Sequence, residues 1–452
     1  MAVLHHKMQK SLFCCFCALV LAFVSCSKTE SAAVEAAGAE AQLNSAAEIE
    51  AEKRRAEEKA LLEEKAKIDA AVDAYLDKLT LDEKIAQLFA VGIDGNDILH
   101  SYAKKEFAGG APGSFLLFDA NIGETAEQTI NFTDSVLSWF IEQNLVPPFF
   151  MIDNEGGGVY RFDGIGSKLL SPQRMTECFS PEEAENYYYL IGLQMKAVNI
   201  HLNLAPLVEV KNENNAAFLG RRSFGTFENV EKYGAVCIKG FDKSGVGTTL
   251  KHFPGNTDVD PHIGLPHLAS SREEIESLYI EPFKRLSAFG ADAVLISHIV
   301  VDSLDEGVPA CFSSKVVCSE LRDAFWHDGL VISDDLYMGA LSKNGYPPEV
   351  AVVKALKAGI DILMISEKRF SKAAQAIKAE AEADAQFKAR IDDAVRHILS
   401  FKIKRNVLAL KPLEDGSGYI VVPVQLKDAA ESLEAFNTAK AEADKIYAEH
   451  IK

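Results

Sequence analysis

The stretch Val246-Gly247-Thr248-Thr249-Leu250-Lys251-His252-Phe253-Pro254-Gly255 decides the fold of this chain. Its first half, residues 246–250, is an apolar run that predicts a buried strand, and a lysine and a histidine end that run. A Pro-Gly turn leads into a loop with two carboxylates and an imidazole, Asp258-Val259-Asp260-Pro261-His262. Polar side chains at the end of a buried strand indicate a site that binds a polar substrate and transfers protons. A solvated turn with incidental charges is the other interpretation of this segment taken alone.

Seven more apolar runs of this kind occur along the chain, and helical patterns lie between most of them. N-cap signals mark two of the helices, at Ser180-Pro181-Glu182-Glu183 and at Ser271-Arg272-Glu273-Glu274. Strands that alternate with helices indicate a parallel sheet, and eight of them favour a closed (β/α)8 TIM barrel over an open doubly wound sheet. No glycine-rich phosphate loop follows the first run, which argues against dinucleotide binding. The eight runs are Leu88 to Val91, Ser114 to Phe118, Phe149 to Ile152, His201 to Leu207, Val246 to Leu250, Ala293 to Ile296, Gly329 to Ile332 and Ile360 to Ile365.

The barrel is expected to occupy residues 67–410. Before it, residues 27–66 are rich in Ala, Glu and Lys, which predicts a partly helical stalk. After it, residues 411–452 form a tail with one strand-like run, Tyr419 to Val424, and a polar helix. This tail is too small to be a second domain.

Residues 1–26 predict a bacterial lipoprotein signal peptide. Lys7 and Lys10 precede an apolar run, Leu12 to Val24, that is too short to span a membrane comfortably. The run ends in Phe23-Val24-Ser25-Cys26, which resembles a lipobox, whose cysteine becomes the lipidated N-terminus. We therefore expect a lipid anchor at Cys26 and a place in the cell envelope, with an ordinary cleaved signal peptide or a retained anchor as the alternatives.

The formal net charge of −19 excludes a general nucleic-acid binder. The cysteines outside the predicted signal peptide are widely spaced and show no C-x-x-C pattern, so no metal site is expected. They are interpreted as small buried apolar residues, with one disulfide as an alternative. These cysteines are Cys178, Cys237, Cys311 and Cys318.

Ionisable side chains stand at the ends of five consecutive predicted strands. Because the carboxyl ends of parallel strands converge on one mouth of a barrel, these side chains predict a single catalytic pocket. Any one of them alone could be a structural cap or an ion pair. In chain order they are Asp153 and Glu155 with Arg161 beyond them, Glu209, Lys251-His252, His298, and Asp334-Asp335.

Four motifs along the chain resemble glycoside hydrolase family 3. They are Ile152-Asp153-Asn154-Glu155-Gly156-Gly157, Arg222-Ser223-Phe224-Gly225, Lys251-His252-Phe253-Pro254-Gly255 and Ile332-Ser333-Asp334-Asp335-Leu336-Tyr337-Met338. The resemblance covers residues 78–408 in the right order. It is to the single-domain bacterial β-N-acetylhexosaminidase branch of the family.

The resemblance implies a role for each site residue. Asp334 would be the nucleophile that forms a glycosyl-enzyme, because a carboxylate suits an oxocarbenium-like centre. His262, oriented by Asp260, would be the acid/base. No metal or organic cofactor is implied. The residues that would hold the sugar are Asp153, Arg161, Arg222, Lys251 and His252.

Three positions depart from the family pattern. The loop between Gly255 and the Asp-x-His pair is shorter than usual and lacks the family's Gly-His-Gly-Asp. Pro261 stands inside the pair where serine is usual, and Glu209 stands where aspartate is usual.

The sequence thus leads us to expect a lipid-anchored, retaining, exo-acting β-N-acetylglucosaminidase. Its partners would be a membrane and a terminal β-GlcNAc on a peptidoglycan- or chitin-derived glycan. The alternatives are a β-glycoside phosphorylase of the same family, another exo-β-glycosidase such as a β-glucosidase, and a catalytically idle, glycan-binding envelope lipoprotein. A Schiff-base aldolase that uses Lys251 is a further alternative, but it does not explain Asp334 and Arg222.

Overall fold

The computed structural model describes residues 52–451, except 54, 57, 58, 61, 108, 109 and 327. The predicted signal peptide and most of the predicted stalk lie outside these residues. The described residues between 52 and 74 are helical. In this described part of the chain, no helix has the length and apolarity that a membrane span requires.

The chain forms two compact units. The smaller unit joins the described residues up to Ala74 with Leu410–Ile420, and in it the Tyr419 hydroxyl donates a hydrogen bond to the Glu64 carboxylate. The larger unit consists of residues 75–409 and 421–452 and contains the predicted site residues.

Eight parallel strands form the centre of the larger unit, in the order β11-β9-β7-β6-β3-β2-β1-β12. Every residue of these strands is buried, which explains why the sequence shows continuous apolar runs and no alternation. The predicted (β/α)8 TIM barrel is confirmed, and each predicted run overlaps one strand. The strands are β1 (Phe89–Gly92), β2 (Ser114–Leu117), β3 (Phe149–Ile152), β6 (Ile200–Asn203), β7 (Gly247–Phe253), β9 (Ala293–Ile296), β11 (Leu330–Ser333) and β12 (Leu363–Met364).

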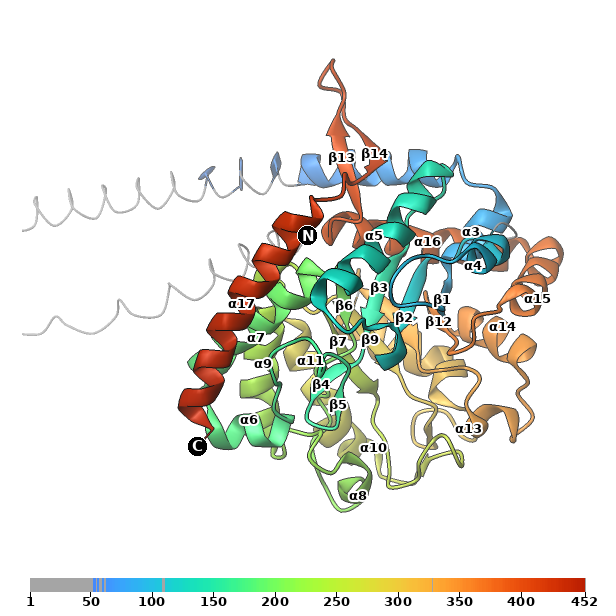
Figure 1. Cartoon of the computed structure of the whole chain (residues 1–452). Coiled ribbons are helices and arrows are strands. Elements are labelled where there is room, and N and C mark those ends of the chain that lie inside the picture. Colours follow the sequence, from blue (N-terminus) through green and yellow to red (C-terminus); the bar gives the residue numbers. More distant parts are fainter. Residues whose placement is uncertain are drawn as a thin grey trace, which may run out of the picture. The chain divides into compact units, whose positions relative to one another are not determined.

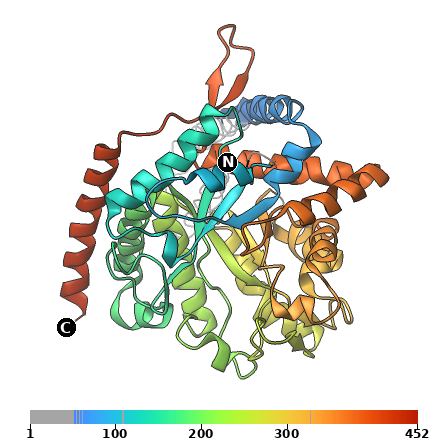
Figure 2. The same ribbon diagram turned by 45° about the vertical axis from the view of Figure 1, so that its right-hand side comes forward.

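Helices surround the strands (Figures 1 and 2). The predicted N-caps at Ser180 and Ser271 are both formed, and Thr80 closes a capping box at the start of α3. The helices are α3 (Leu81–Gln87), α4 (Ser101–Phe107), α5 (Ala126–Glu142), α6 (Pro172–Cys178), α7 (Pro181–Ala197), α8 (Ala216–Leu219), α9 (Phe227–Ser244), α10 (Arg272–Glu274), α11 (Glu281–Ser287), α12 (Asp323–Phe325), α13 (Gly339–Ser342), α14 (Pro348–Ala358), α15 (Ser371–Ala383), α16 (Ala385–Lys404) and α17 (Ala429–His450).

The described residues also form three two-stranded sheets, together with 3-10 turns and π-helical segments. The sheets pair β4 (Asn154–Gly156) with β5 (Val159–Tyr160), β8 (His267–Leu268) with β10 (Val300–Val301), and β13 (Leu408–Pro412) with β14 (Tyr419–Pro423). The 3-10 turns are Asp119–Asn121 and Ala310–Phe312, and the π-helical segments are Ile275–Ile280 and Lys315–Arg322. The tail therefore contains the predicted strand and helix, and α17 packs against α7 and α5.

The barrel closes between β11 and β12, the two ends of the strand order. Ile332 and Ile362 form a parallel bridge there. The Ser333 amide donates to the Ile362 carbonyl at 2.9 Å, and the Leu336 amide donates to the Met364 carbonyl at 3.0 Å. These bonds make the sheet a closed ring.

A buried carboxylate holds this seam together. Asp361 is fully buried and accepts hydrogen bonds from the Val331 amide at 2.9 Å, from Arg322, and from Arg390 at 2.7 Å. Burial alone would raise the pKa of Asp361, but Arg322, His397 and Arg390 outweigh it and hold the pKa well below its usual range. Asp361 therefore ties the strand β11 to two surrounding helical segments.

Asp361→Asn should lower the free energy of unfolding by about 3–5 kcal/mol, because it removes the buried carboxylate that pairs with Arg322 and Arg390. Urea unfolding at neutral pH measures this loss. The folded pKa lies below the unfolded value of about 3.9, so the contribution is complete above that value and is lost as the pH falls through the folded pKa. The control is Asp393→Asn, which removes an exposed partner of Arg390 and should cost about 1 kcal/mol or less. Equal effects of the two substitutions would contradict the role of Asp361.

Candidate active site

The carboxyl ends of β3, β7 and β11 bring four of the predicted site residues together, Asp153, Lys251, His252 and Asp334. β3 leads directly into Asp153, and Asp334 follows the last residue of β11. Lys251 and His252 lie inside β7, which runs to Phe253, whereas the sequence predicted that they follow the strand. The hydrogen bonds of the sheet therefore fix the backbone of both residues.

Lys251 lies between two carboxylates. Its side chain is 3% exposed, and its Nζ lies 2.6 Å from Asp153 Oδ1 and 2.7 Å from Glu155 Oε1. Burial would lower the pKa of Lys251, but these carboxylates outweigh burial and raise the pKa above its usual value. Lys251 therefore remains an ammonium ion inside the barrel mouth.

Arg222 extends this ion pair into a chain of charges. Its Nε and Nη2 donate to the two oxygens of Glu155 at 2.8 and 2.7 Å. This bidentate arrangement fixes the orientation of the guanidinium and carboxylate planes relative to each other. Burial would raise the pKa of Glu155, but Lys251 and Arg222 hold it well below its usual range. The charges therefore alternate from Asp153 through Lys251 and Glu155 to Arg222.

Glu209 and His252 form a second pair. Glu209 Oε1 lies 2.7 Å from His252 Nδ1 and also accepts from the Asn256 side-chain amide at 3.1 Å. The other carboxylate oxygen, Oε2, is buried and has no hydrogen-bond partner among the described residues. Glu209 thus orients the imidazole and keeps one acceptor free.

Asp334 is partly exposed at the end of β11. Its backbone amide donates to the Ile296 carbonyl at 2.9 Å, and the Asp335 amide donates to its Oδ1 at 2.9 Å. Burial would raise the pKa of Asp334, but His298, His252, the Asp335 amide and Lys251 together bring it below its usual value. The carboxylate is therefore ionised at neutral pH and positioned to stabilise, or to attack, an electron-poor carbon.

His298 supports the segment that carries Asp334. Its Nε2 donates to the Asp335 carbonyl at 3.0 Å, and its Nδ1 lies 3.4 Å from Cys311 Sγ. Burial lowers the pKa of His298 and raises the pKa of the Cys311 thiol, so a neutral imidazole accepts from an S–H group. From the sequence, His298 was expected only as an ionisable side chain at a strand end. Cys311 was expected to be a small buried apolar residue.

His262 and Asp260, for which the resemblance implies an acid/base role, are in contact. His262 Nδ1 lies 2.8 Å from Asp260 Oδ1, and the His262 amide donates to the same oxygen at 2.9 Å. The loop is attached to the segment after β11, where the Ala340 amide donates to the Pro261 carbonyl at 3.0 Å. The His262 side chain is 69% exposed, and no contact joins it to Asp334 among the described residues.

Arg161 lies apart from the charge chain. Its side chain pairs with Asp119 at 3.2 Å, and its amide donates to the Asn154 side chain at 2.8 Å. Asp119 directly follows the predicted strand 114–118, so its position at a strand end can be read from the sequence. In the described part of the chain, no group of three or more His, Cys, Asp and Glu side chains is arranged to hold a metal ion.

Known proteins resemble this chain in sequence and in structure. Beta-hexosaminidase A of Pseudoalteromonas piscicida is 30% identical over 56% of this chain, and beta-hexosaminidase of Hydrogenovibrio crunogenus is 31% identical over 47% of it. These matches span 45% and 62% of the two relatives. A family 3 beta-N-acetylglucosaminidase from Paenibacillus sp. superposes with a TM-score of 0.68 at 30% identity, covering 80% of this chain and 69% of that one.

The comparison with family models agrees with these similarities. The model described as "Glycosyl hydrolase family 3 N terminal domain" matches residues 80–401, which include the eight barrel strands and every predicted site residue except Cys26. Since this match covers more than half of the chain, the chain belongs to glycosyl hydrolase family 3.

Proposed function

We propose that this protein is a retaining, exo-acting β-N-acetylglucosaminidase that works through a covalent glycosyl-enzyme. The observation that carries the proposal is the ionised Asp334 at the end of β11, beside the charge chain of the mouth. Relatives named beta-hexosaminidase and a beta-N-acetylglucosaminidase structure support the sugar.

In the first step, an oxygen of Asp334 attacks the anomeric carbon while the bond to the leaving oxygen breaks. The leaving oxygen takes a proton from His262, and Asp260 stabilises the imidazolium form that gives it. In the second step, His262 removes a proton from water, and that water replaces Asp334 at the same carbon. Two displacements at one carbon retain the β configuration.

The charge chain would hold the sugar during both steps. Lys251 and Arg222 offer donors to ring hydroxyls, and Asp153 offers an acceptor. Their partners fix these side chains before the sugar arrives, which lowers the cost of orienting it. Glu209 Oε2 has no partner among the described residues and would accept a further hydrogen bond.

The histidine of the acid/base pair also favours a second candidate, a β-glycoside phosphorylase of the same family. An imidazole, unlike a carboxylate, does not repel an incoming phosphate ion. Incubating aryl glycosides of GlcNAc, glucose and xylose with and without phosphate separates the candidates, because only a phosphorylase forms sugar 1-phosphate.

Asp334→Ala should reduce kcat by about 10⁴-fold or more while the protein stays folded, because no covalent intermediate can form. Steady-state hydrolysis of an aryl GlcNAc glycoside measures the loss, and circular dichroism checks the fold. A 2-fluoro sugar should label Asp334 in the unmodified protein. Labelling of Asp335 or Asp153 would contradict the assignment.

His262→Ala should lose about 10²–10⁴-fold in kcat/KM on natural β-linked disaccharides and far less on aryl glycosides with good leaving groups, because a poor leaving group needs the acid most. Added azide should restore turnover of the aryl glycosides by replacing base-assisted water. Asp260→Asn should show a milder form of the same pattern. Equal losses on both substrate types, without azide rescue, would mean that His262 serves only the loop structure.

We also propose that the protein acts in the cell envelope, anchored by a lipid on Cys26, on fragments derived from peptidoglycan or chitin. The support is the lipobox-like sequence at residues 23–26 and the acetylated sugar that both polymers contain.

Cys26→Ala should release the protein from the membrane fraction, because the thiol that carries the lipid is gone. Detergent partitioning of cell fractions measures this, and Cys17→Ala, in the same predicted signal peptide, is the matched control that should stay with the membrane. Unchanged partitioning of Cys26→Ala would favour a retained signal anchor.

A further inference from the structure

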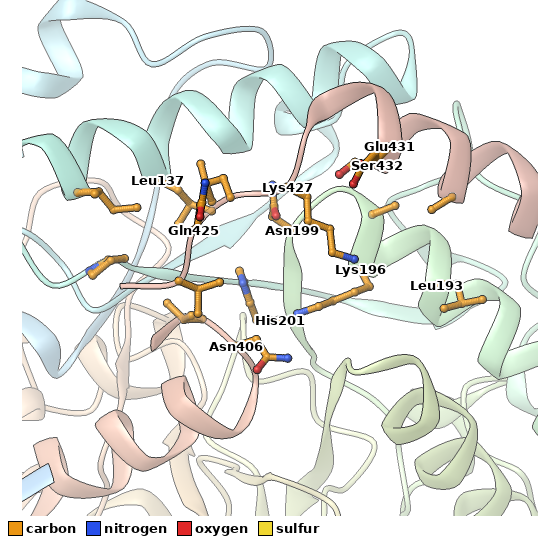
Figure 3. A pocket seen from close by; sticks show the side chains of 17 residues that line it. Leu137, Leu193, Lys196, Asn199, His201, Asn406, Gln425, Lys427, Glu431 and Ser432 are labelled. Carbon is orange, nitrogen blue, oxygen red and sulfur yellow. The ribbon is translucent and has the colours of Figure 1, made fainter. Parts of the chain in front are cut away.

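A cavity of about 520 Å³ lies at the amino end of β6, opposite the mouth of the barrel. Its walls come from α5, from α7, from residues 406–407 and from the tail between Val424 and Ala435 (Figure 3). The tail wall lies beyond the family domain, which ends at residue 401. The cavity therefore needs a part of this chain that the family match does not include.

The volume is within the range of small-molecule sites, which is about 300–1,000 Å³. Most of the lining is apolar, and this part would accept an aliphatic or aromatic body. The principal apolar residues are Leu137, Ile141, Leu193, Val407, Val424 and Leu426.

Two lysines line the cavity, and neither has an ion-pair partner among the described residues. Lys196 Nζ donates to the Arg405 carbonyl at 3.0 Å. Burial, Arg405 and Lys427 lower the pKa of Lys196 to about 8, so the two lysines lie close enough to repel each other. Glu431 also lines the cavity but pairs with neither lysine. The cavity thus concentrates positive charge in a chain whose net charge is −19.

A buried histidine adds a hydrogen-bond donor. His201 is 3% exposed, and its Nδ1 accepts from the Phe150 amide at 3.2 Å. Burial, together with Lys196 and Lys402, holds the pKa of His201 well below its usual value, so the ring is neutral and its proton sits on Nε2. Nε2 has no partner in the described part of the chain, and Figure 3 shows the ring in the same space as Lys196 and Lys427. This N–H is accessible from the cavity, and an acceptor on a ligand would take its hydrogen bond.

We propose that this cavity binds an amphipathic anion, namely an aliphatic chain that ends in a carboxylate. One carboxylate oxygen accepts from His201 Nε2 and the other pairs with Lys196, while the chain lies along the apolar wall. The site is independent of the hydrolase reaction, because it lies at the other end of the barrel.

The charges decide between ligand classes. A carboxylate between Lys196 and Lys427 removes the repulsion between them, which a neutral polar ligand does not do. A wholly apolar ligand would cover the N–H of His201 without accepting from it. A small anion without a chain would leave the apolar wall in contact with water.

The test is calorimetric titration of the full chain with octanoate, kept below its micelle concentration. Octanol has the same chain without the charge, and acetate has the charge without the chain. Octanoate should bind about tenfold or more tightly than either compound, and it should raise the melting temperature. Lys196→Met should weaken octanoate binding by about ten- to a hundredfold, the worth of one charge-assisted hydrogen bond. Lys445→Met, on an exposed part of α17 that does not line the cavity, is the matched control and should change nothing.

Three outcomes would overturn the proposal. They are equal affinities for octanoate and octanol, unchanged octanoate binding by Lys196→Met, and no octanoate binding at millimolar concentration. Circular dichroism shows whether Lys196→Met is folded. If it is not, Lys427→Met, an exposed position in the tail, replaces it, and octanoate binding should again weaken.

Discussion

The seam between β11 and β12 is the contact on which the rest of the molecule depends. A parallel sheet closes into a barrel only when its two end strands meet, and here they meet at the bridge between Ile332 and Ile362. The buried carboxylate of Asp361 pairs with two arginines and stabilises this contact between the two strands. Asp334 follows the seam strand directly, so closure of the ring also sets where the reacting carboxylate stands relative to Lys251 on β7.

The mouth shows how several charges can be buried together. Lys251 alone would be costly in an interior, and so would Glu155 alone. Each has the other as a counter-ion, and Arg222 and Asp153 extend the pairing to the edge of the pocket. Separating any of these side chains from its partner would leave a buried charge uncompensated, which is costly. The side chains are therefore held in one arrangement. A rigid set of donors and acceptors suits the recognition of a sugar, whose hydroxyl groups differ only in direction.

The sequence contained the periodicity of the barrel and the order of its strand ends, because buried parallel strands leave continuous apolar runs. The ion pairs between the site residues could not be predicted from it. Lys251 and Asp153 are 98 positions apart, and Arg222 and Glu155 are 67 apart, so only the closed ring decides which strand end faces which. The sequence did not indicate that the Cys311 thiol is a polar partner, because its hydrogen bond to His298 depends on how the connection between β9 and β11 folds back on itself. The wall that the tail adds beside β6 was hidden for the same reason.

The charge pairing in the mouth has a consequence for inhibitors. Asp153 and Glu155 are matched by Lys251 and Arg222, whereas Glu209 and Asp334 have imidazole neighbours. The pocket therefore holds more carboxylate groups than lysine and arginine side chains, which favours a negative potential. A sugar mimic with a protonated ring nitrogen gains from this field, while an acidic analogue of the same shape loses from it. This discrimination against acidic analogues weakens as salt screens the pocket.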